Sequence, residues 1–390
     1  MKKMLTVLAG LMVVCLLSGC SSTPKVEENA NGVVPASQWE EQYPDIYASF
    51  VKNEENENVF DHVEEYPMIS TVYEGMAFST YYNSARSHTY SLTDVQATGR
   101  PHALANCLTC KSADYTSIVN ANGVSAYKEE FATTVASLEE GISCYNCHAN
   151  DVSTLTVTHS YLTKALGADT EVEVSTQTCG QCHVEYYFDP ETKEVVLPYT
   201  SIEEANPDDI LAYFNTMGFA DYTNPRTGTK QIKVQHPEFE TYNATGSVHA
   251  GTYTCADCHM GTTKNADGEE YTNHNWTSPL DNDELVQNSC AQCHSDLETF
   301  VKGIQNDSEA RVNTIGKSLE ALTNKLADAV ASGNYTDAEL DAIRAVNRDA
   351  QFYWDFVFVE NSEGAHNSRL TKACLDKAET LITQANGLFK

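Results

Sequence analysis

The residues best suited to chemistry in this sequence are cysteines arranged in pairs. Ten of the 13 cysteines form five C-x-x-C pairs, which read CLTCK (107–111), CYNCH (144–148), CGQCH (179–183), CADCH (255–259) and CAQCH (290–294). Four pairs run directly into histidine, the pattern for a haem joined by two thioether bonds and ligated by the adjacent imidazole. Zinc sites, redox pairs and disulfides use similar spacings, but four repeats and a variant favour haem. The sequence therefore predicts five haem c groups, attached through Cys107, Cys110, Cys144, Cys147, Cys179, Cys182, Cys255, Cys258, Cys290 and Cys293.

The first pair differs from the others because Lys111 occupies the position of the histidine. Lysine can bind iron only as the neutral amine, so the metal and burial must lower its pKa. An amine donor on one face of the iron, with the other face open, describes a catalytic haem. The alternative is that Lys111 is incidental and that a distant histidine binds this iron.

The other four haems need more histidines than their motifs contain. A haem built for electron transfer usually has both axial positions filled, so each motif histidine requires a distal partner. The motif histidines are His148, His183, His259 and His294. Eight histidines lie outside the motifs, and spacing alone does not select among them. Good candidates are His88, His249, His274 and His366; the other four are His62, His102, His159 and His236.

The N-terminus has the composition of an export signal. It reads MKKMLTVLAGLMVVCLLSGCSS, with two lysines, an apolar run and a lipoprotein-type site that would make Cys20 the lipidated first residue. We expect a signal peptide over 1–19 and a lipid-anchored polar tether over 20–40. The alternative is a cleaved secretory signal with an incidental cysteine. Both place the protein outside the cytoplasm, at the outer face of the cytoplasmic membrane or in the periplasm.

Composition narrows the class of partner. The formal net charge is −31, and haem propionates would add further negative charge. Such a surface repels nucleic acid, so we expect none as a partner, and a small anionic substrate would need a local cationic pocket.

The pattern of apolar residues divides the chain into two parts. Between 41 and 305 the apolar runs are short, so a haem-packed body of short helices and loops is expected. From 306 to 390 apolar residues recur at helical spacing, which predicts three long helices in the same domain. The first helix should end at 333–335, the second should start with the capping box Thr336–Glu339, and the third should start near Ser368 and bury Cys374. The fold class is therefore mainly α, and the long helices suit a homodimer interface, although packing within one chain explains the same pattern.

At this point the sequence resembles a known family. One C-x-x-C-K followed by four C-x-x-C-H motifs, with CGQCHVEYYF at 179–188 and QIKVQHPEFETY at 231–242, is similar to the ammonia-forming cytochrome c nitrite reductases. The resemblance runs from about residue 60 to the end. It implies six-electron reduction of nitrite to ammonium at a lysine-ligated haem, with four bis-histidine haems relaying electrons.

The resemblance also assigns residues to the site. Lys111 matches the ligand of the catalytic haem iron, and Arg100, Tyr186 and His236 match the distal-pocket residues. An arginine supplies a permanent cation beside a bound anion, and histidine and tyrosine can deliver protons. The segment between Arg100 and Cys107 is shorter than in many family members.

Two further ligand sets come from the resemblance. Glu185 and Gln235, with the backbone carbonyls of Tyr186 and Lys233, match the ligands of one calcium ion, a hard cation that prefers oxygen donors. The distal histidines match as His88 with the 179–183 haem, His274 with 144–148, His366 with 255–259 and His249 with 290–294.

The implied partners are nitrite and related small nitrogen oxides, a membrane-bound quinol-oxidising multihaem cytochrome as electron donor, and the membrane through the lipid anchor. Two alternatives remain. The chain could be a non-catalytic electron conduit, or a reductase acting mainly on hydroxylamine or sulfite.

Overall fold

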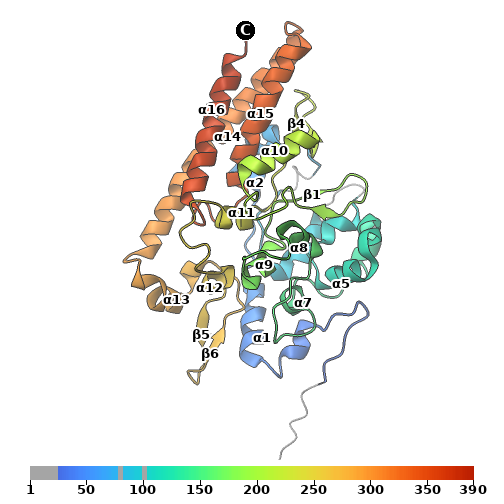
Figure 1. Cartoon of the computed structure of the whole chain (residues 1–390), viewed down its shortest axis with the longest axis vertical. Helices are drawn as coiled ribbons and strands as arrows, with labels where there is room; N and C mark the ends of the chain where they lie inside the picture. Colours follow the sequence, from blue (N-terminus) through green and yellow to red (C-terminus); the bar gives the residue numbers. More distant parts are fainter. Residues whose placement is uncertain (1–24, 78–81, 99–102) are drawn as a thin grey trace, which may run out of the picture.

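The computed structural model describes residues 25–77, 82–98 and 103–390 (Figure 1). The expected signal peptide, Cys20, Arg100 and His102 lie outside these residues. Within the described ranges, no helix has the length and apolar character needed to cross a membrane.

The body is built from short helices joined by loops, as predicted, and the fold is mainly α. Its α-helices are α1 (Pro44–Val51), α2 (His62–Glu65), α3 (Ile69–Val72), α4 (Ser91–Ala97), α5 (Ala113–Asn122), α6 (Phe131–Val135), α7 (Cys144–His148), α8 (Ser160–Leu166), α9 (Val174–Gly180), α10 (Pro207–Met217), α11 (Glu238–Asn243), α12 (Cys255–His259) and α13 (Asp283–Asn288). The 3-10 helices are η1 (Ala36–Trp39), η2 (Lys52–Glu55), η3 (His88–Tyr90), η4 (Ala105–Leu108), η5 (Gly123–Lys128), η6 (Pro279–Asp281) and η7 (Cys290–Gln292). Three antiparallel ribbons complete it: β1 (Tyr187–Phe188) with β2 (Val195–Val196), β3 (Tyr222–Thr223) with β4 (Lys230–Gln231), and β5 (Thr262–Lys264) with β6 (Glu270–Thr272).

The haem motifs begin helical turns because the residues before them are good caps. Ser143 caps α7 and Thr254 caps α12, each as half of a capping box with the residue three positions later. These boxes satisfy backbone amides that the first turn leaves without partners. A helical turn places residues i and i+3 on the same side, so both cysteines of a motif face one haem.

The three long helices are α14 (Leu297–Ser332), α15 (Asp337–Phe358) and α16 (Ser368–Gly387), which pack side by side along one side of the molecule (Figure 1). Gly333 ends α14 in the left-handed conformation with φ of 66°, Thr336 and Glu339 form the capping box of α15, and Cys374 is 1% exposed in the core. These three predictions are confirmed. The boundary expected at residue 306 falls inside α14, because Asp296 caps the helix ten residues before that position.

The expected tether over 20–40 needs correction. From Asn29 onward the chain packs on the body, and Val33 is fully buried against Ala113 and Tyr145. The Asn29 amide donates to Asp114 at 2.8 Å, and the Val34 amide donates to the Asn150 side chain at 2.9 Å. Two adjacent valines in a polar stretch favour burial, which ends any tether before Asn29.

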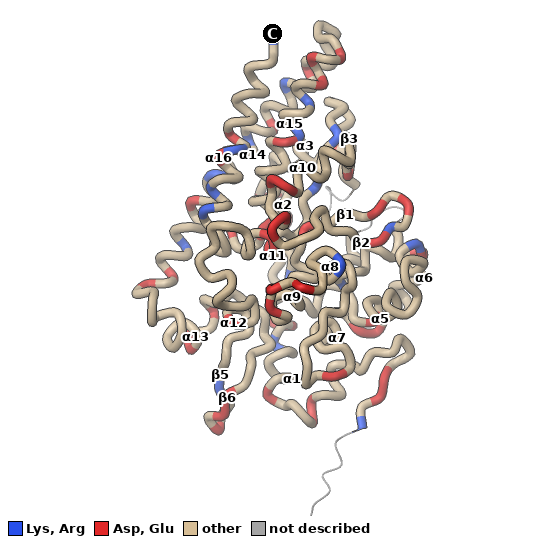
Figure 2. Tube along the Cα trace, viewed as in Figure 1, with Lys and Arg blue, Asp and Glu red and all other residues tan. Residues whose placement is uncertain are grey.

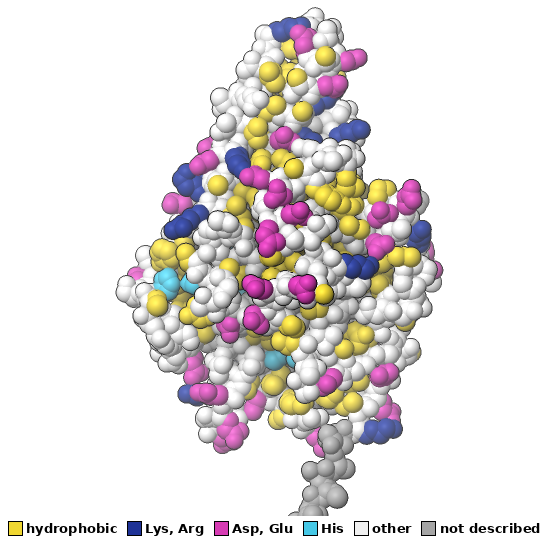
Figure 3. Space-filling view, viewed as in Figure 1, with side chains coloured by type: hydrophobic (Ala, Val, Ile, Leu, Met, Phe, Trp, Pro, Cys, Tyr) yellow, Lys and Arg dark blue, Asp and Glu magenta, His cyan; other side chains and the backbone are white. Residues whose placement is uncertain are grey.

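The charge of the surface is uneven. Figures 2 and 3 show acidic side chains across the middle of one face, whereas several lysines and arginines lie along α14 and α16. An anionic substrate approaching the acidic face would therefore be repelled unless a local cation guides it.

Gly180, inside the third haem motif, allows the closest approach between two elements of the body. A Cβ atom built on it would lie 2.2 Å from Phe239 Cδ2, so only glycine lets α9 pack directly on α11. We expect Gly180→Ala to destabilise the haem-loaded protein by about 1–3 kcal/mol through overpacking. Thermal unfolding measures this, with Gly303→Ala on α14 as the control, because a Cβ there meets nothing within 4 Å. An unchanged melting temperature for Gly180→Ala would contradict this packing.

Candidate active site and haem-binding motifs

The five cysteine pairs converge in the body. The Cys110 thiol is a hydrogen-bond neighbour of Cys182, and Cys179 is one of Cys255. The charge of Cys290 also acts on Cys258. The motifs 107–111, 179–183, 255–259 and 290–294 therefore follow one another in space. The remaining motif, 144–148, lies beside 179–183, since Cys147 is near Cys182.

The cysteines of the described ranges are free thiols. None of the eleven cysteines in the described ranges forms a disulfide. The same ranges contain no group of three or more histidine, cysteine or acidic side chains that could hold a metal ion.

The histidines predicted to share an iron lie opposite one another. Ring centroids are separated by 5.8 Å for His88–His183, 6.0 Å for His259–His366 and 6.2 Å for His249–His294. Two imidazoles bound to one metal through nitrogens at about 2 Å would place their centroids roughly 6 Å apart. In the fourth pair, burial lowers the pKa of His274, a hydrogen bond to Thr272 raises it, and the adjacent His148 lowers it further.

In four of these histidines, Nδ1 contacts an oxygen atom of the protein, as is usual for histidines that bind a metal through Nε2. Nδ1 contacts a backbone oxygen in His148, His259 and His274, at 2.8, 3.0 and 2.9 Å. In His366 it lies 2.7 Å from the Glu360 carboxylate. Such contacts fix the ring and leave Nε2 for a metal, so these residues fit haem iron.

His183 has two histidine neighbours. Besides His88, the ring of His236 lies 6.3 Å from it between centroids. Geometry alone therefore leaves its axial partner open between these two, and only the family resemblance selects His88.

Large apolar side chains are exposed around the last motif. Val248, Tyr253 and Phe300 are between 50% and 72% exposed. Tyr253 contacts His249, and Phe300 contacts His294, each with ring centroids under 6 Å apart. A porphyrin between these histidines would cover this apolar surface, which supports a haem here.

Lys111 lies in the same region as His88 and His236. Burial, with smaller contributions from the charges of His183 and Lys111, lowers the pKa of His88 to about 3. Burial also lowers the pKa of His236 to about 4, with Glu238 opposing and Lys111 contributing to the decrease. The charge of Lys111 therefore acts on both rings, and its backbone carbonyl accepts a hydrogen bond from Ser91 at 3.0 Å.

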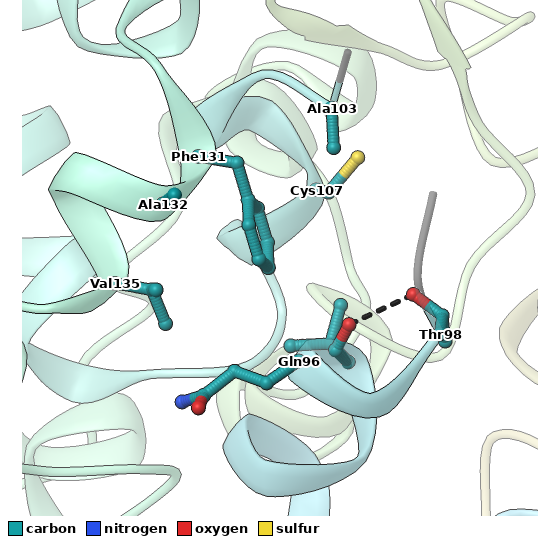
Figure 4. A pocket seen from close by; sticks show the side chains of 8 residues that line it. Gln96, Thr98, Ala103, Cys107, Phe131, Ala132 and Val135 are labelled. Carbon is teal, nitrogen blue, oxygen red and sulfur yellow. Dashed lines mark hydrogen bonds between the residues drawn. The ribbon is translucent and has the colours of Figure 1, made fainter. Parts of the chain in front are cut away.

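A cavity of about 340 Å³ opens beside Cys107 (Figure 4). It is lined mainly by apolar side chains, among them Phe131 and Val135, with Gln96 and Thr98 on α4 and just after it. An apolar space next to an attachment cysteine fits the edge of a porphyrin.

A hydrogen bond links the neighbours of two predicted distal-pocket residues, Tyr186 and His236, while Arg100 lies outside the described residues. The Gln235 amide donates to Glu185 Oε2 at 2.6 Å, which joins the segments that carry Tyr186 and His236. The Tyr186 ring packs on Phe188 with centroids 5.4 Å apart. Nδ1 of His236 is buried and has no protein hydrogen-bond partner, so this atom is available to a substrate or water.

The predicted calcium ligands also meet at this place. The Gln235 side-chain amide lies 2.8 Å from the Lys233 carbonyl oxygen. Oε1 of Glu185 is buried without a hydrogen-bond partner, as is Oε2 of Glu240, whose other oxygen accepts from the Glu185 amide at 3.0 Å. Orphaned carboxylate oxygens beside carbonyl oxygens are the donor set that Ca²⁺ prefers.

The buried acidic side chains near these ligands also favour a bound cation. We call Glu185, Asp221, Glu240 and Asp355 the buried carboxylate cluster. Burial raises the pKa of Glu240 to about 8 and of Asp221 to about 6, and raises that of Glu185 strongly. In the described part of the chain, Lys233 and Arg348 are the only buried lysine and arginine. The charge of Glu240 also raises the pKa of Glu185, and a divalent cation beside Glu185 would let both carboxylates stay ionised, which fits calcium.

Sequence reasoning missed three members of this cluster: Asp221, Glu240 and Asp355. Glu240 stands in the QIKVQHPEFETY string, but Asp221 and Asp355 are ordinary acidic residues without a local signal. Three histidines stay without an assigned role: His102, which lies outside the described residues, His62 and His159. His159 is 2% exposed and stacks on Tyr161, and His62 packs against Tyr82.

Known structures resemble this chain in fold. A solved structure of cytochrome c nitrite reductase from Desulfovibrio desulfuricans, described with two calcium sites, is 26% identical and has a TM-score of 0.79. The match covers 90% of this chain and 85% of that one. The Outer Cell Wall Cytochrome OcwA and an undecahaem cytochrome from the S-layer of Carboxydothermus ferrireducens are each 20% identical, with TM-scores of 0.43 and 0.40. The match to OcwA covers 76% of this chain and 48% of OcwA. The match to the undecahaem cytochrome covers 78% of this chain and 41% of that chain. Scores this low carry no argument about function.

The sequence model of one protein family, cytochrome c552, matches residues 36–389, which is most of the chain. Together with the nitrite reductase structure, this match confirms the resemblance found in the sequence. The chain belongs to the cytochrome c552 family.

Proposed function

We propose that this enzyme reduces nitrite to ammonium at the haem held by Cys107 and Cys110. The balanced reaction is NO₂⁻ + 8 H⁺ + 6 e⁻ → NH₄⁺ + 2 H₂O. The observation that carries the proposal is the convergence of Lys111, His236 and the Glu185–Gln235 bond in one buried region beside an attachment motif. The haem, when bound, supplies the electrons and an open position for the substrate nitrogen.

The residues of the chain bind the anion and deliver protons. Lys111 would offer its amine as the protein ligand of the catalytic haem, which would bind and reduce the substrate. Arg100 provides a permanent positive charge for nitrite in a site with little water, where that charge acts strongly. His236 and Tyr186 donate hydrogen bonds and protons to the oxygens that leave as water.

The remaining four haems form the electron relay. Their proposed axial pairs are His148 with His274, His183 with His88, His259 with His366 and His294 with His249. The succession of motifs in space supports a continuous path to the catalytic haem. Five haems in all follow from five motifs, and a membrane-bound quinol-oxidising multihaem cytochrome is the proposed donor.

One calcium ion completes the proposed site, held by Glu185, Gln235 and the carbonyls of Tyr186 and Lys233. Glu185→Gln removes the charge but keeps the volume, so we expect loss of bound calcium and a 10- to 100-fold fall in activity, as for ligand-orienting groups at metal sites. Elemental analysis and the nitrite assay measure both. Glu204→Gln is the matched control, since Glu204 is exposed and bonds only with Thr200. Full calcium content in Glu185→Gln would rule out this ligand set.

Location and assembly are part of the proposal. We infer export by the signal at 1–19 and a lipid on Cys20 that keeps the enzyme on the outer face of the cytoplasmic membrane or in the periplasm. The packed segment from Asn29 leaves the chain between 20 and 28 as the tether. The long helices α14, α15 and α16 are the proposed homodimer interface within a single catalytic domain.

The test is the ammonium yield from nitrite under anaerobic conditions, with haem-loaded protein and reduced viologen dye. We expect one ammonium for each nitrite and six oxidised dye equivalents. A fully loaded protein that neither oxidises dye nor forms ammonium would be an electron conduit. Rapid turnover of hydroxylamine or sulfite without nitrite turnover would support the other alternative.

A further inference from the structure

The segment that carries His236 is held by an unusual succession of hydrogen bonds. Three consecutive backbone amides each donate to a carboxylate of the buried carboxylate cluster. Lys233 N donates to Asp221 at 2.8 Å, Val234 N to Asp355 at 2.9 Å and Gln235 N to Glu185 at 2.6 Å. The three acceptors come from different parts of the chain: the residue before β3, the helix α15, and the loop after the third haem motif.

Asp355 makes more contacts than the other two acceptors. It forms an ion pair with the Lys233 ammonium at 3.0 and 3.1 Å, and it accepts a hydrogen bond from the Tyr73 hydroxyl. Asp355 is fully buried and the Lys233 side chain is 2% exposed. The same ammonium donates to the Val234 carbonyl at 2.7 Å, so donor and acceptor of that residue are both occupied.

These contacts have a consequence for side-chain direction. The Lys233 side chain is directed to Asp355, and the Gln235 side chain turns back to donate to the Lys233 carbonyl oxygen at 2.8 Å. The backbone amides of both residues are bound to carboxylates as well, so backbone and side chains of this segment are restrained together. His236, one residue further on, follows immediately after three restrained positions. A shift of this segment would move the His236 ring, and about 1 Å of displacement can cost about 100-fold in rate.

We propose that Asp355, on the long helix α15, is a positioning residue that aims His236 at the substrate. Its side chain contacts Tyr73, Lys233 and Val234, and it acts through the last two. The inference rests on the proposed function of His236 as a proton donor. It makes the C-terminal helices part of the catalytic apparatus as well as of the packing.

A double-mutant cycle tests this, using Asp355→Asn, His236→Asn and the variant that combines them in the haem-loaded full chain. We expect Asp355→Asn to lower kcat for nitrite about 10- to 100-fold with little change in KM. If Asp355 acts through His236, the combined variant is no slower than His236→Asn alone, because the group that it positions is already missing. Multiplied effects in the combined variant would overturn the proposal.

Amide hydrogen exchange of the 231–238 peptide is the second readout and does not depend on turnover. We expect at least about tenfold faster exchange in Asp355→Asn, because Val234 N loses its charged acceptor. Asp341→Asn is the matched control on the same helix, since its exposed carboxylate pairs only with Arg344. Unchanged exchange in Asp355→Asn would also overturn the proposal. Failure of the proposed function would be distinguishable, because wild type would then form no ammonium while the exchange difference could still be measured.

Discussion

Lys111→Ala should lose ammonium formation from nitrite by more than about 100-fold while the protein keeps its other four haems. Loss of an outer-shell group at a metal site typically costs 10- to 100-fold, and Lys111 is proposed to bind the iron directly. The measurement is ammonium yield with reduced viologen dye, together with haem content from the absorbance of the alkaline pyridine complex.

Two further variants separate the amine from the mere presence of a side chain. Lys111→His converts the motif to the form of the other four, so we expect normal haem attachment but impaired turnover. Lys164→Ala is the control, because Lys164 is exposed and its nearest carboxylate, on Glu194, lies 3.8 Å away. Wild-type activity in Lys111→Ala would show that Lys111 is incidental and would favour a distant histidine as the ligand of this iron.

The second large effect is expected at His236. Asparagine preserves a hydrogen-bond donor and much of the volume, but it cannot carry a proton near neutral pH. Proton transfer by a positioned side chain contributes about 10²- to 10⁴-fold, so His236→Asn should lower kcat within that range. We propose that nitrite binding depends mainly on Arg100 and the haem, so KM should change little.

Tyr186→Phe provides the comparison for this variant. Phenylalanine removes one hydroxyl from the same pocket, and we expect a smaller decrease in kcat than for His236→Asn, because a neutral tyrosine releases its proton less readily. Steady-state kinetics at several nitrite concentrations give both constants. A His236→Asn enzyme with unchanged kcat, or one in which only KM rises, would remove His236 from proton delivery and leave it a role in binding.

What the sequence determined about this protein is local. Haem attachment depends on five successive residues, so the five motifs and the exceptional Lys111 can be identified without a structure. The long helices were equally predictable, because capping at Thr336, termination at Gly333 and the apolar stripe of α14 each involve neighbours within a few turns.

Composition was less reliable where a few apolar residues interrupt a polar stretch. Residues 29–40 read as tether, yet Val33 fills a site between α5 and α7. Its partners, Ala113 and Tyr145, are far away in the sequence, so no local pattern indicates this burial.

The tertiary structure alone decided which distant groups meet. The residues left eight histidines open for four axial positions, and packing brings three of the pairs within about 6 Å between ring centroids. It also placed Asp355 on the amide of Val234, 121 positions away in the chain. An acidic residue on a helix has no local feature that marks it as buried, because its environment is set by elements that close around it only on folding.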